Sequence, residues 1–558
     1  MAIRIAVGDE SFEKIRESGL YYVDKTELLY DLVGQTSNKV TLFTRPRRFG
    51  KTLNMSMMES FFDVGRDSKA LFEGLDIAKH EEFCSEWMNQ YPVLSISLKD
   101  VDGLDFESAK RMLSSTLARA FLKYSALAGH ENVASSDKTR FSQLLAGTDD
   151  IAVIKNSLDT IMRMMNAVYG KPVILLIDEY DVPMAKGDSN GYYREITNIM
   201  RSMYSKALKD NPYIKMAVLT GCLRIAEESI FTGLNNLSVK TIIDTDYDEC
   251  FGFTQDEMDK LLTDTGLFEH RSDFKEWYDG YLFGKTEVYC PWDVLNYVND
   301  LQQDPDALPA NYWANTSGND VIKRFLEGNF NVTADFETLL KGGCIEKKIN
   351  PNITYGDLTQ DETNLWSVLY MTGYLTIPSE SMPRKEKGIG KISKGKFEDP
   401  FKLKLPNKEI KMLFENTIAV WFKNKLLKED RTELFNAIWS GNAETITDEL
   451  CGFLGDSISF YDYHEIFYHA FLAGLLSGMK GISIESNRET GTGRADVILQ
   501  YPRKGLVAIF EFKSAKSESA MSKKCDEALK QIDINKYSFP FRHNTVLKYG
   551  IAFFEKQC

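Results

Sequence analysis

The sequence predicts an α/β protein: a parallel sheet covered by helices, then a helical middle region, then a smaller α/β part. Short aliphatic runs alternate with helix-like segments between residues 21 and 243. Runs that are apolar on both faces are typical of a parallel sheet with helices on each side. An aromatic-rich helical region follows from Phe251 to about Pro378, and aromatic residues at this density usually mean packing between elements. The last hundred residues show the pattern helix, three strands, helix and strand. The four aliphatic runs are Val40–Thr44, Val93–Leu98, Val173–Ile177 and Ile214–Thr220.

Length and composition are those of a globular protein with several domains. The chain has 558 residues, and at about 150 residues per domain this corresponds to roughly three to four domains. We predict three parts with the boundaries 1–250, 251–410 and 411–558. A content of 43% hydrophobic residues excludes global disorder. The net charge of −14 argues against a protein that coats nucleic acid through its whole surface.

No segment of the sequence predicts insertion into a membrane. The longest aliphatic run, Val173–Ile177, is far shorter than the about 20 apolar residues that a transmembrane helix needs. No apolar signal segment precedes the acids Asp9 and Glu10. The eight cysteines are scattered and show neither zinc-type nor disulfide-type spacing. We therefore expect a soluble cytoplasmic protein.

The first strand leads into a candidate phosphate-binding loop. In a P-loop, G-x-x-x-x-G-K-[ST], backbone N–H groups cradle phosphates, the lysine reaches the β- and γ-phosphates, and the hydroxyl holds Mg²⁺. The half Gly50-Lys51-Thr52 fits this form, whereas Arg45 replaces the first glycine. The replacement suggests that the loop closes differently or carries extra positive charge near the phosphates. The loop residues predicted to bind the nucleotide are Arg45, Pro46, Arg47, Arg48, Phe49, Gly50, Lys51 and Thr52.

Two further strands end in polar residues that complete a nucleotide site. The run Val173–Ile177 ends in Asp178, which would hold Mg²⁺, and Glu179, which would polarise the attacking water. The alternative is a buried strand capped by a solvated acidic turn. The run Ile214–Thr220 ends in Thr220 and is followed by Arg224, and both are candidates for sensing the γ-phosphate, although Arg224 could equally pair with the nearby acids Glu227 or Glu228.

A second acidic site is predicted near the end of the chain. Residues 493–500 and 506–513 read as two strands around the turn 501–505. Folding this hairpin about the midpoint of Pro502 and Gly505 places Asp496 opposite Glu511, about 5 Å away, with Lys513 on the same face. Two carboxylates and an ammonium are costly to bury for structure alone, but they suit a Mg²⁺ site. The alternative is a partly exposed strand pair with an ordinary Glu–Lys ion pair.

Residues outside the hairpin could complete this site. Glu465 and His469 share one helix face upstream, and Gln531 follows a helical segment downstream. Residues 461–558 contain 14 Lys and Arg against 11 Asp and Glu, whereas the rest of the chain is strongly acidic. This small excess has the sign expected for a phosphodiester substrate.

The motifs of both parts of the chain resemble those of known protein families. Those of the first part resemble the AAA-like ATPases of a prokaryotic family whose members commonly end in a PD-(D/E)xK nuclease-superfamily domain. They are Tyr22-Val23-Asp24-Lys25-Thr26, Arg45 to Thr52, Ile177-Asp178-Glu179-Tyr180-Asp181 and Phe231-Thr232-Gly233-Leu234-Asn235-Asn236. The segments Gly493-Arg494-Ala495-Asp496, Glu511-Phe512-Lys513 and Gln531-Ile532 look like that nuclease domain's motif.

The resemblance implies a P-loop NTPase sheet, a helical lid and linker region, and a restriction-endonuclease-like C-terminal domain. In the superfamily the aspartate and glutamate bind the metal, the lysine acts at the water, and a helix acid completes the cluster. These roles transfer to Asp496, Glu511, Lys513 and Glu465. Ala495 stands where the superfamily has proline, and Arg45 looks like the ATPase family's own form of the loop.

The sequence therefore predicts an ATP-binding and ATP-hydrolysing protein with a Mg²⁺-dependent nuclease domain that acts on DNA, with Mn²⁺ as an alternative metal. A second hypothesis is a nucleotide-switched scaffold that binds nucleic acid or protein through a catalytically inactive nuclease fold. A third, a purely structural protein, requires both motif pairs to be coincidental. A homo-oligomer stays open, because one chain does not reveal an arginine supplied by a neighbouring subunit.

Overall fold

The computed structural model describes most of the chain, and these residues form two compact units. The first comprises Met1–Val321 and Glu346–Ile410, and the second Ile322–Ile345 and Lys411–Cys558. The residues described are 3–35, 39–224, 230–231, 236–313, 333–351, 353, 361–381, 399–426, 430–455, 472, 475–476, 481–490, 493–554 and 557–558.

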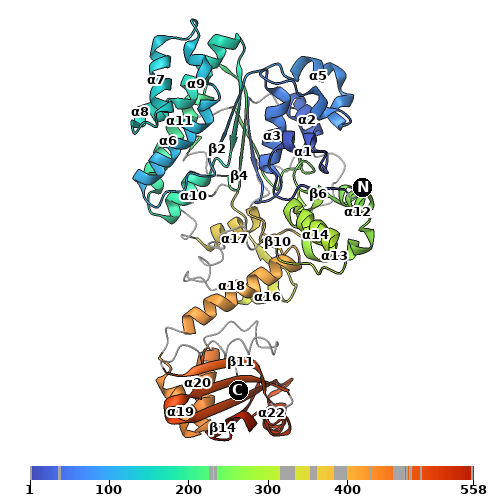
Figure 1. The fold of residues 1–558 in the computed structure, drawn as a ribbon, viewed down its shortest axis with the longest axis vertical. Helices are drawn as coiled ribbons and strands as arrows, with labels where there is room; N and C mark the ends of the chain where they lie inside the picture. Colours follow the sequence, from blue (N-terminus) through green and yellow to red (C-terminus); the bar gives the residue numbers. More distant parts are fainter. Residues whose placement is uncertain are drawn as a thin grey trace. The chain divides into compact units, whose positions relative to one another are not determined.

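A five-stranded parallel sheet forms the centre of the first unit (Figure 1). Its order is β2-β3-β4-β1-β5, and every neighbouring pair is parallel. Every residue of β1 and β3 is buried, which explains why these strands read as continuous apolar runs. The predicted α/β fold with a parallel sheet is confirmed. The strands are β1 (Val40–Thr44), β2 (Val93–Ser97), β3 (Val173–Asp178), β4 (Ile214–Gly221) and β5 (Leu237–Lys240).

Helices cover both faces of this sheet, as Figure 1 shows. One face carries α1 (Phe12–Glu17), α2 (Glu27–Gln35), α3 (Lys51–Phe62) and α5 (Glu81–Trp87). The other carries α6 (Phe106–Leu122), α7 (Ser135–Leu145), α8 (Ile151–Lys155), α9 (Ser157–Tyr169), α10 (Val182–Ser189) and α11 (Tyr193–Leu208). Because the strands are parallel, the carboxyl ends of β1, β3 and β4 meet at one edge, where polar residues from distant parts of the sequence can form a site.

The middle of the sequence adds helices and small sheets, and its described part lies mostly in the first unit. Its aromatic residues pack together, as their density suggested; Phe274 and Tyr297, for example, have ring centroids 4.7 Å apart. Whether 251–410 is a separate part stays a prediction. The elements are α12 (Gln255–Thr265), α13 (Arg271–Tyr278), α14 (Pro291–Gln303), α17 (Glu362–Met371), β6 (Phe253–Thr254), β7 (Tyr281–Phe283), β8 (Thr286–Tyr289), β9 (Ile345–Lys347) and β10 (Phe401–Leu403).

The second unit contains a four-stranded mixed sheet with the order β11-β12-β13-β14. The first three strands are antiparallel neighbours, and β14 is parallel to β13 after a crossover through α22. A Cβ at Gly550 would lie 2.5 Å from the backbone oxygen of Cys525, so the glycine lets α22 approach β14 closely. The elements are α16 (Thr333–Leu340), α18 (Lys408–Leu426), α19 (Thr432–Ser440), α20 (Ala443–Gly455), β11 (Ser483–Thr490), β12 (Gly493–Tyr501), β13 (Leu506–Ser514), α22 (Met521–Ile534) and β14 (Thr545–Phe553). Within the described part of the chain, no helix combines the length and apolar character needed to cross a bilayer.

Candidate functional site

The phosphate-binding loop joins β1 to α3. Gly50 has φ +79° and directly precedes the helix, where its backbone oxygen accepts a hydrogen bond from Asn54 N at 3.0 Å. Arg48 also has a left-handed backbone, with φ +71°. The turn therefore leads into the first turn of α3, whose N–H groups have no intrahelical partners and can bind an anion.

The two predicted halves of the nucleotide site meet at Asp178. The Thr52 hydroxyl donates a hydrogen bond to Asp178 Oδ2 at 2.7 Å, and the Thr220 hydroxyl donates to Asp178 Oδ1. Burial raises the pKa of Asp178, and the negative charge of Glu179 adds to this effect. Three residues from three different elements thus form one polar cluster at the edge of the sheet.

Lys51 and Glu179 lie beside this cluster. The Lys51 ammonium donates hydrogen bonds to the backbone oxygens of Arg45, at 3.2 Å, and Pro46, at 3.0 Å. Its nitrogen also lies 3.9 Å from Glu179 Oε1. Glu179 has φ +54°, a conformation that costs about 1–3 kcal/mol in a residue with a side chain and is concentrated at functional sites.

The environment of Arg45 differs from the one predicted from the loop motif, which placed this residue at the phosphates. Its guanidinium is fully buried and donates hydrogen bonds to the backbone oxygens of Thr44 and Lys240, both at 2.9 Å. It also lies over the Phe251 ring, 5.0 Å from the centroid. Burial lowers the pKa of Arg45 to about 10. This placement indicates that the side chain fastens the loop to β5 rather than contacting phosphate.

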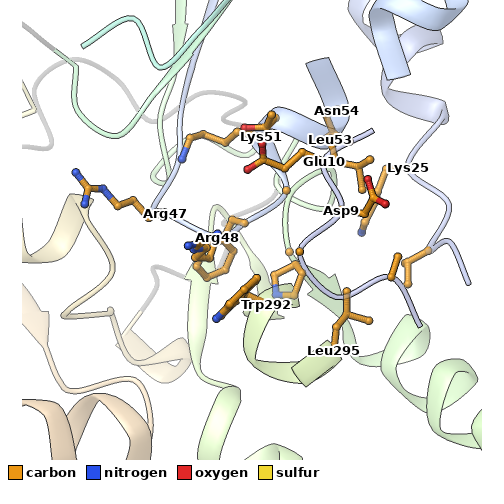
Figure 2. A pocket seen from close by; sticks show the side chains of 18 of the residues that line it. Asp9, Glu10, Lys25, Arg47, Arg48, Lys51, Leu53, Asn54, Trp292 and Leu295 are labelled. Atoms are coloured by element: carbon orange, nitrogen blue, oxygen red, sulfur yellow. The ribbon is translucent and has the colours of Figure 1, made fainter. Parts of the chain in front are cut away.

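A pocket of about 430 Å³ opens onto the loop (Figure 2). Lys51, Thr52 and Glu179 line it together with the N-terminal segment and α14. This volume is within the range of small-molecule sites. In Figure 2 Arg48 lies beside Trp292, with Cζ 4.3 Å from the ring centroid, whereas Arg47 is directed away from them. Trp292 was not predicted as a pocket residue, because aromatic residues at the density of this region are typical of packing between elements.

A buried acid that was not predicted from the sequence, Asp181, holds the end of β4. Asp181 Oδ2 accepts hydrogen bonds from the backbone N–H groups of Cys222 and Leu223, both at 3.0 Å. These bonds place the segment that leads to Arg224, which is half-buried. Glu227 and Glu228, the alternative partners of Arg224, lie outside the described residues.

We expect Gly221→Ala to destabilise the protein by about 1–3 kcal/mol, the usual range for overpacking. A Cβ at this position would lie 2.5 Å from Tyr180 Cε1 and 2.6 Å from Asp181 Oδ1, so both side chains would have to move. Thermal denaturation measures the effect. Gly129→Ala is the matched control, since a Cβ there meets no atom within 4 Å. Equal melting temperatures for the two variants would contradict the prediction.

The C-terminal hairpin has the register predicted from its turn. Val497 pairs with Phe510, and one step further along the same register Asp496 stands opposite Glu511. Asp496 Oδ2 accepts a hydrogen bond from the backbone N–H of Phe512 at 2.8 Å. The Lys513 ammonium lies 3.0 Å from Glu511 Oε1. The hairpin therefore brings together the three residues selected from the motif.

Glu511 is the buried member of this cluster. Its side chain is 2% exposed, and no hydrogen-bond donor reaches Oε2 among the described residues. Burial, followed by the charge of Asp496, raises the pKa of Glu511 to about 7. A divalent cation would satisfy the orphaned oxygen and offset the repulsion, so these residues fit a metal.

Two further residues, Glu465 and Gln531, were predicted as members of the acid site. Glu465 lies outside the described residues. Gln531 is half-buried on α22, the helix that packs across β13 and β14. The described residues contain no group of three or more His, Cys, Asp or Glu side chains arranged for a metal. Within this part of the chain, the candidate metal ligands are Asp496 and Glu511.

Comparison with known proteins identifies both ends of the chain. Residues 6–231 match a family model described as predicted AAA-ATPase, and residues 463–558 match one described as PD-(D/E)XK nuclease superfamily. The chain joins an AAA-ATPase-like domain to a PD-(D/E)XK nuclease-superfamily domain. A similar protein, "Uncharacterized protein in vnfD 5'region" of Azotobacter chroococcum mcd 1, is 23% identical over 559 residues, covering 97% of this chain and 94% of the relative.

A pair of buried carboxyl groups lies next to the pocket and the AAA-ATPase-like loop. Asp293 of α14 and Glu409 at the start of α18 are both fully buried. Glu409 Oε1 accepts a hydrogen bond from Trp313 N at 2.8 Å, whereas no N–H group reaches Glu409 Oε2 or either Asp293 oxygen among the described residues. Burial raises the pKa of both groups, and the charge of Asp293 raises that of Glu409 further. A proton shared by the two carboxyls supplies the missing donor.

This pair predicts a pH dependence of stability. Both folded pKa values lie above the ordinary values of 3.8 and 4.5, so the folded protein binds more protons than the unfolded chain above pH 4.5. The free energy of unfolding should therefore fall as the pH rises from about 5 to 8, by up to about 1.4 kcal/mol per pH unit for each retained proton. Glu409→Gln, whose amide can donate to Asp293, should flatten this slope.

Chemical denaturation at several pH values measures the slope. The exposed acid Asp67, changed to Asn, is the control and should leave the slope unchanged. A Glu409→Gln variant with the wild-type slope would show that Asp293 and Glu409 are both ionised in the folded protein.

Proposed function

We propose that this cytoplasmic protein binds ATP with Mg²⁺ in the pocket of its AAA-ATPase-like domain and hydrolyses it, and that its nuclease-superfamily domain cleaves DNA with Mg²⁺ or Mn²⁺. The observation that carries the first half is the 2.7 Å hydrogen bond between Thr52 and Asp178 beside the pocket. Two motifs from distant parts of the sequence meet there, as a phosphate-bound Mg²⁺ requires.

Each residue of the nucleotide site has a distinct part in this proposal. The N–H groups at the start of α3 and the Lys51 ammonium would hold the phosphates. Thr52 and Asp178 would hold Mg²⁺, which neutralises charge on the phosphate oxygens. Glu179 would accept a hydrogen bond from the attacking water and orient it. The Lys51 ammonium has three N–H donors, which point to the backbone oxygens of Arg45 and Pro46 and, at 3.8 Å, to Cys222 Sγ, so it would exchange one of these contacts for a phosphate oxygen.

The second half of the proposal is supported by the hairpin. Asp496 and Glu511 would hold the metal, which supplies a polarised water and neutralises charge on the phosphodiester. The Lys513 ammonium, 3.0 Å from Glu511 Oε1, would lie where it can orient the water. The fit rests on Glu511, a buried carboxylate whose second oxygen has no donor within the described part of the domain.

The test measures ATP turnover and DNA cleavage on the same full-length protein. Labelled single-stranded and duplex DNA are incubated with Mg²⁺ or Mn²⁺, with and without ATP, for the wild type, Lys51→Ala and Glu511→Ala. We expect Lys51→Ala to lose ATP binding and turnover, and Glu511→Ala to lose cleavage while it keeps turnover. Cleavage at the wild-type rate by Glu511→Ala would overturn the nuclease assignment.

A nucleotide-switched scaffold is the second candidate. It is favoured by the ion pair between Lys513 and Glu511, 3.0 Å long, which a catalytically inactive strand pair would also form. ATP turnover with no DNA cleavage under any of these conditions would support the scaffold and exclude the nuclease.

A further inference from the structure

The net positive charge of the nuclease-superfamily domain lies at one end of its sheet. We define the basic end as residues 501–505 and 533–548, which comprise the last residue of β12, the loop before β13, the end of α22, the loop before β14 and the start of β14. It contains five Lys and Arg residues against one acid, Asp533. The rest of residues 461–558 contains nine Lys and Arg against ten Asp and Glu. The excess positive charge of the domain therefore lies at this end.

The two loops of the basic end are fixed to one another. Thr545 N donates a hydrogen bond to the backbone oxygen of Gly505 at 3.0 Å, where β13 and β14 begin side by side. Phe541 is buried against the sheet and anchors the second loop. The cationic residues of both loops, which lie apart in the sequence, thus form one surface: Arg503, Lys504, Lys536, Arg542 and Lys548.

This surface also carries an exposed aromatic ring. The Phe539 side chain is 64% exposed, and Arg542 Cζ lies 5.7 Å from its ring centroid. Lys548 is paired with Asp533 at 2.6 Å. The other four cations of the basic end form no ion pair with a described residue. Proteins that bind single-stranded nucleic acid combine these two features: the exposed ring stacks on a base, and the cations that have no acidic partner neutralise the phosphates.

We propose that the basic end binds single-stranded nucleic acid and is separate from the Asp496–Glu511 site. In a duplex the bases are already stacked on one another, so the Phe539 ring can stack only on a base of a single strand. Along β13, Glu511 lies six residues beyond Gly505, about 20 Å at about 3.3 Å per residue. Lys548 lies closer to Glu511, on the neighbouring strand β14, but it is already paired with Asp533. The surface would hold a strand without taking part in the chemistry. The inference rests on the proposed function, because that function identifies nucleic acid as the polymer that this surface binds.

The test is fluorescence anisotropy with the full-length protein, a labelled oligothymidylate of about 15 nucleotides, and EDTA in place of metal. Phe539→Ala should weaken binding by about tenfold, the usual effect of one lost stacking contact. Lys504→Gln/Arg542→Gln should weaken it and lower the slope of log K against log salt by about 1.4, since each phosphate contact on a single strand contributes about 0.7. Phe539 is exposed, so its removal leaves the core intact.

The control removes the same charge elsewhere. Lys69 and Lys209 are exposed residues of the AAA-ATPase-like domain, and Lys69→Gln/Lys209→Gln should leave the affinity and the salt slope unchanged. An equal loss in this control would overturn the proposal, because it would assign binding to net charge. Wild-type affinity for Phe539→Ala would also overturn it, as would equal Phe539-dependent binding to a duplex or to anionic phosphatidylglycerol vesicles instead of the oligonucleotide.

The experiment separates this inference from the proposed nuclease activity. Binding in EDTA needs no cleavage, so Glu511→Ala should bind the oligonucleotide as tightly as the wild type. If the wild type binds through Phe539 but cuts no DNA with Mg²⁺ or Mn²⁺, the nuclease proposal fails and the binding surface stands. If Glu511→Ala loses binding, the two sites are one and the inference is wrong.

Discussion

Glu179→Gln should bind ATP with unchanged affinity and hydrolyse it about 10²–10⁴-fold more slowly, the usual contribution of a positioned general base. Glutamine keeps the size and the left-handed backbone of this residue, whose φ is +54°. It cannot take up a proton or attract the hydrogens of a water as a carboxylate does. The phosphate-binding groups, Lys51 and the start of α3, are untouched. The measurements are the equilibrium dissociation constant for ATP and the kcat of phosphate release.

A second acid in the same pocket provides the control. Glu10 also lines the pocket, and its carboxylate lies 3.1 Å from Lys99 Nζ. Glu10→Gln removes one negative charge from the pocket and should change the turnover by no more than a few-fold. If Glu179→Gln hydrolyses ATP at the wild-type rate, another residue orients the water. If it loses ATP binding as well, Glu179 acts on the loop through Lys51 rather than on the water.

The parts of this fold that could be predicted are those encoded within a short stretch of sequence. The strand Val40–Thr44 has the same bounds in the structure, because a run that is apolar on both faces is buried only in the middle of a covered sheet. The hairpin register also follows from local information. Pro502 and Gly505 bound the turn, and the period of two along each strand then places Asp496 opposite Glu511.

The features that could not be predicted depend on contacts between distant residues. Arg45 lies in the loop motif, but its guanidinium is held by Lys240, almost 200 residues away. Trp292 contacts Arg48 only because the middle region folds back onto the pocket. Asp293 and Glu409 are acidic residues, a type that is usually exposed, and no pattern in the sequence around either one indicates that they are buried together. Local pattern carries no information about such pairs.

Glu511→Gln should abolish metal-dependent DNA cleavage and, in EDTA, make the nuclease-superfamily domain more stable. The ordinary pKa of this group is 4.5, and the folded domain raises it to about 7, so above pH 7 folding must bury a charge. Glutamine resembles the protonated carboxyl and removes this cost, which is on the order of 2 kcal/mol. It also removes a metal ligand, and we expect cleavage to fall by more than about 100-fold, since losing even an outer-shell partner costs about 10–100-fold.

Opposite effects on stability and activity are the signature of a functional carboxylate, because natural sites retain groups that the fold alone would exclude. Differential scanning calorimetry at pH 8 in EDTA measures the first effect and the cleavage assay the second. The exposed acid Glu518, changed to Gln, is the control and should alter neither. The alternative interpretation, a strand pair with an ordinary Glu–Lys ion pair, predicts the opposite result. If Lys513 and Glu511 only stabilise the strand pair, Glu511→Gln must lower the melting temperature and leave cleavage intact.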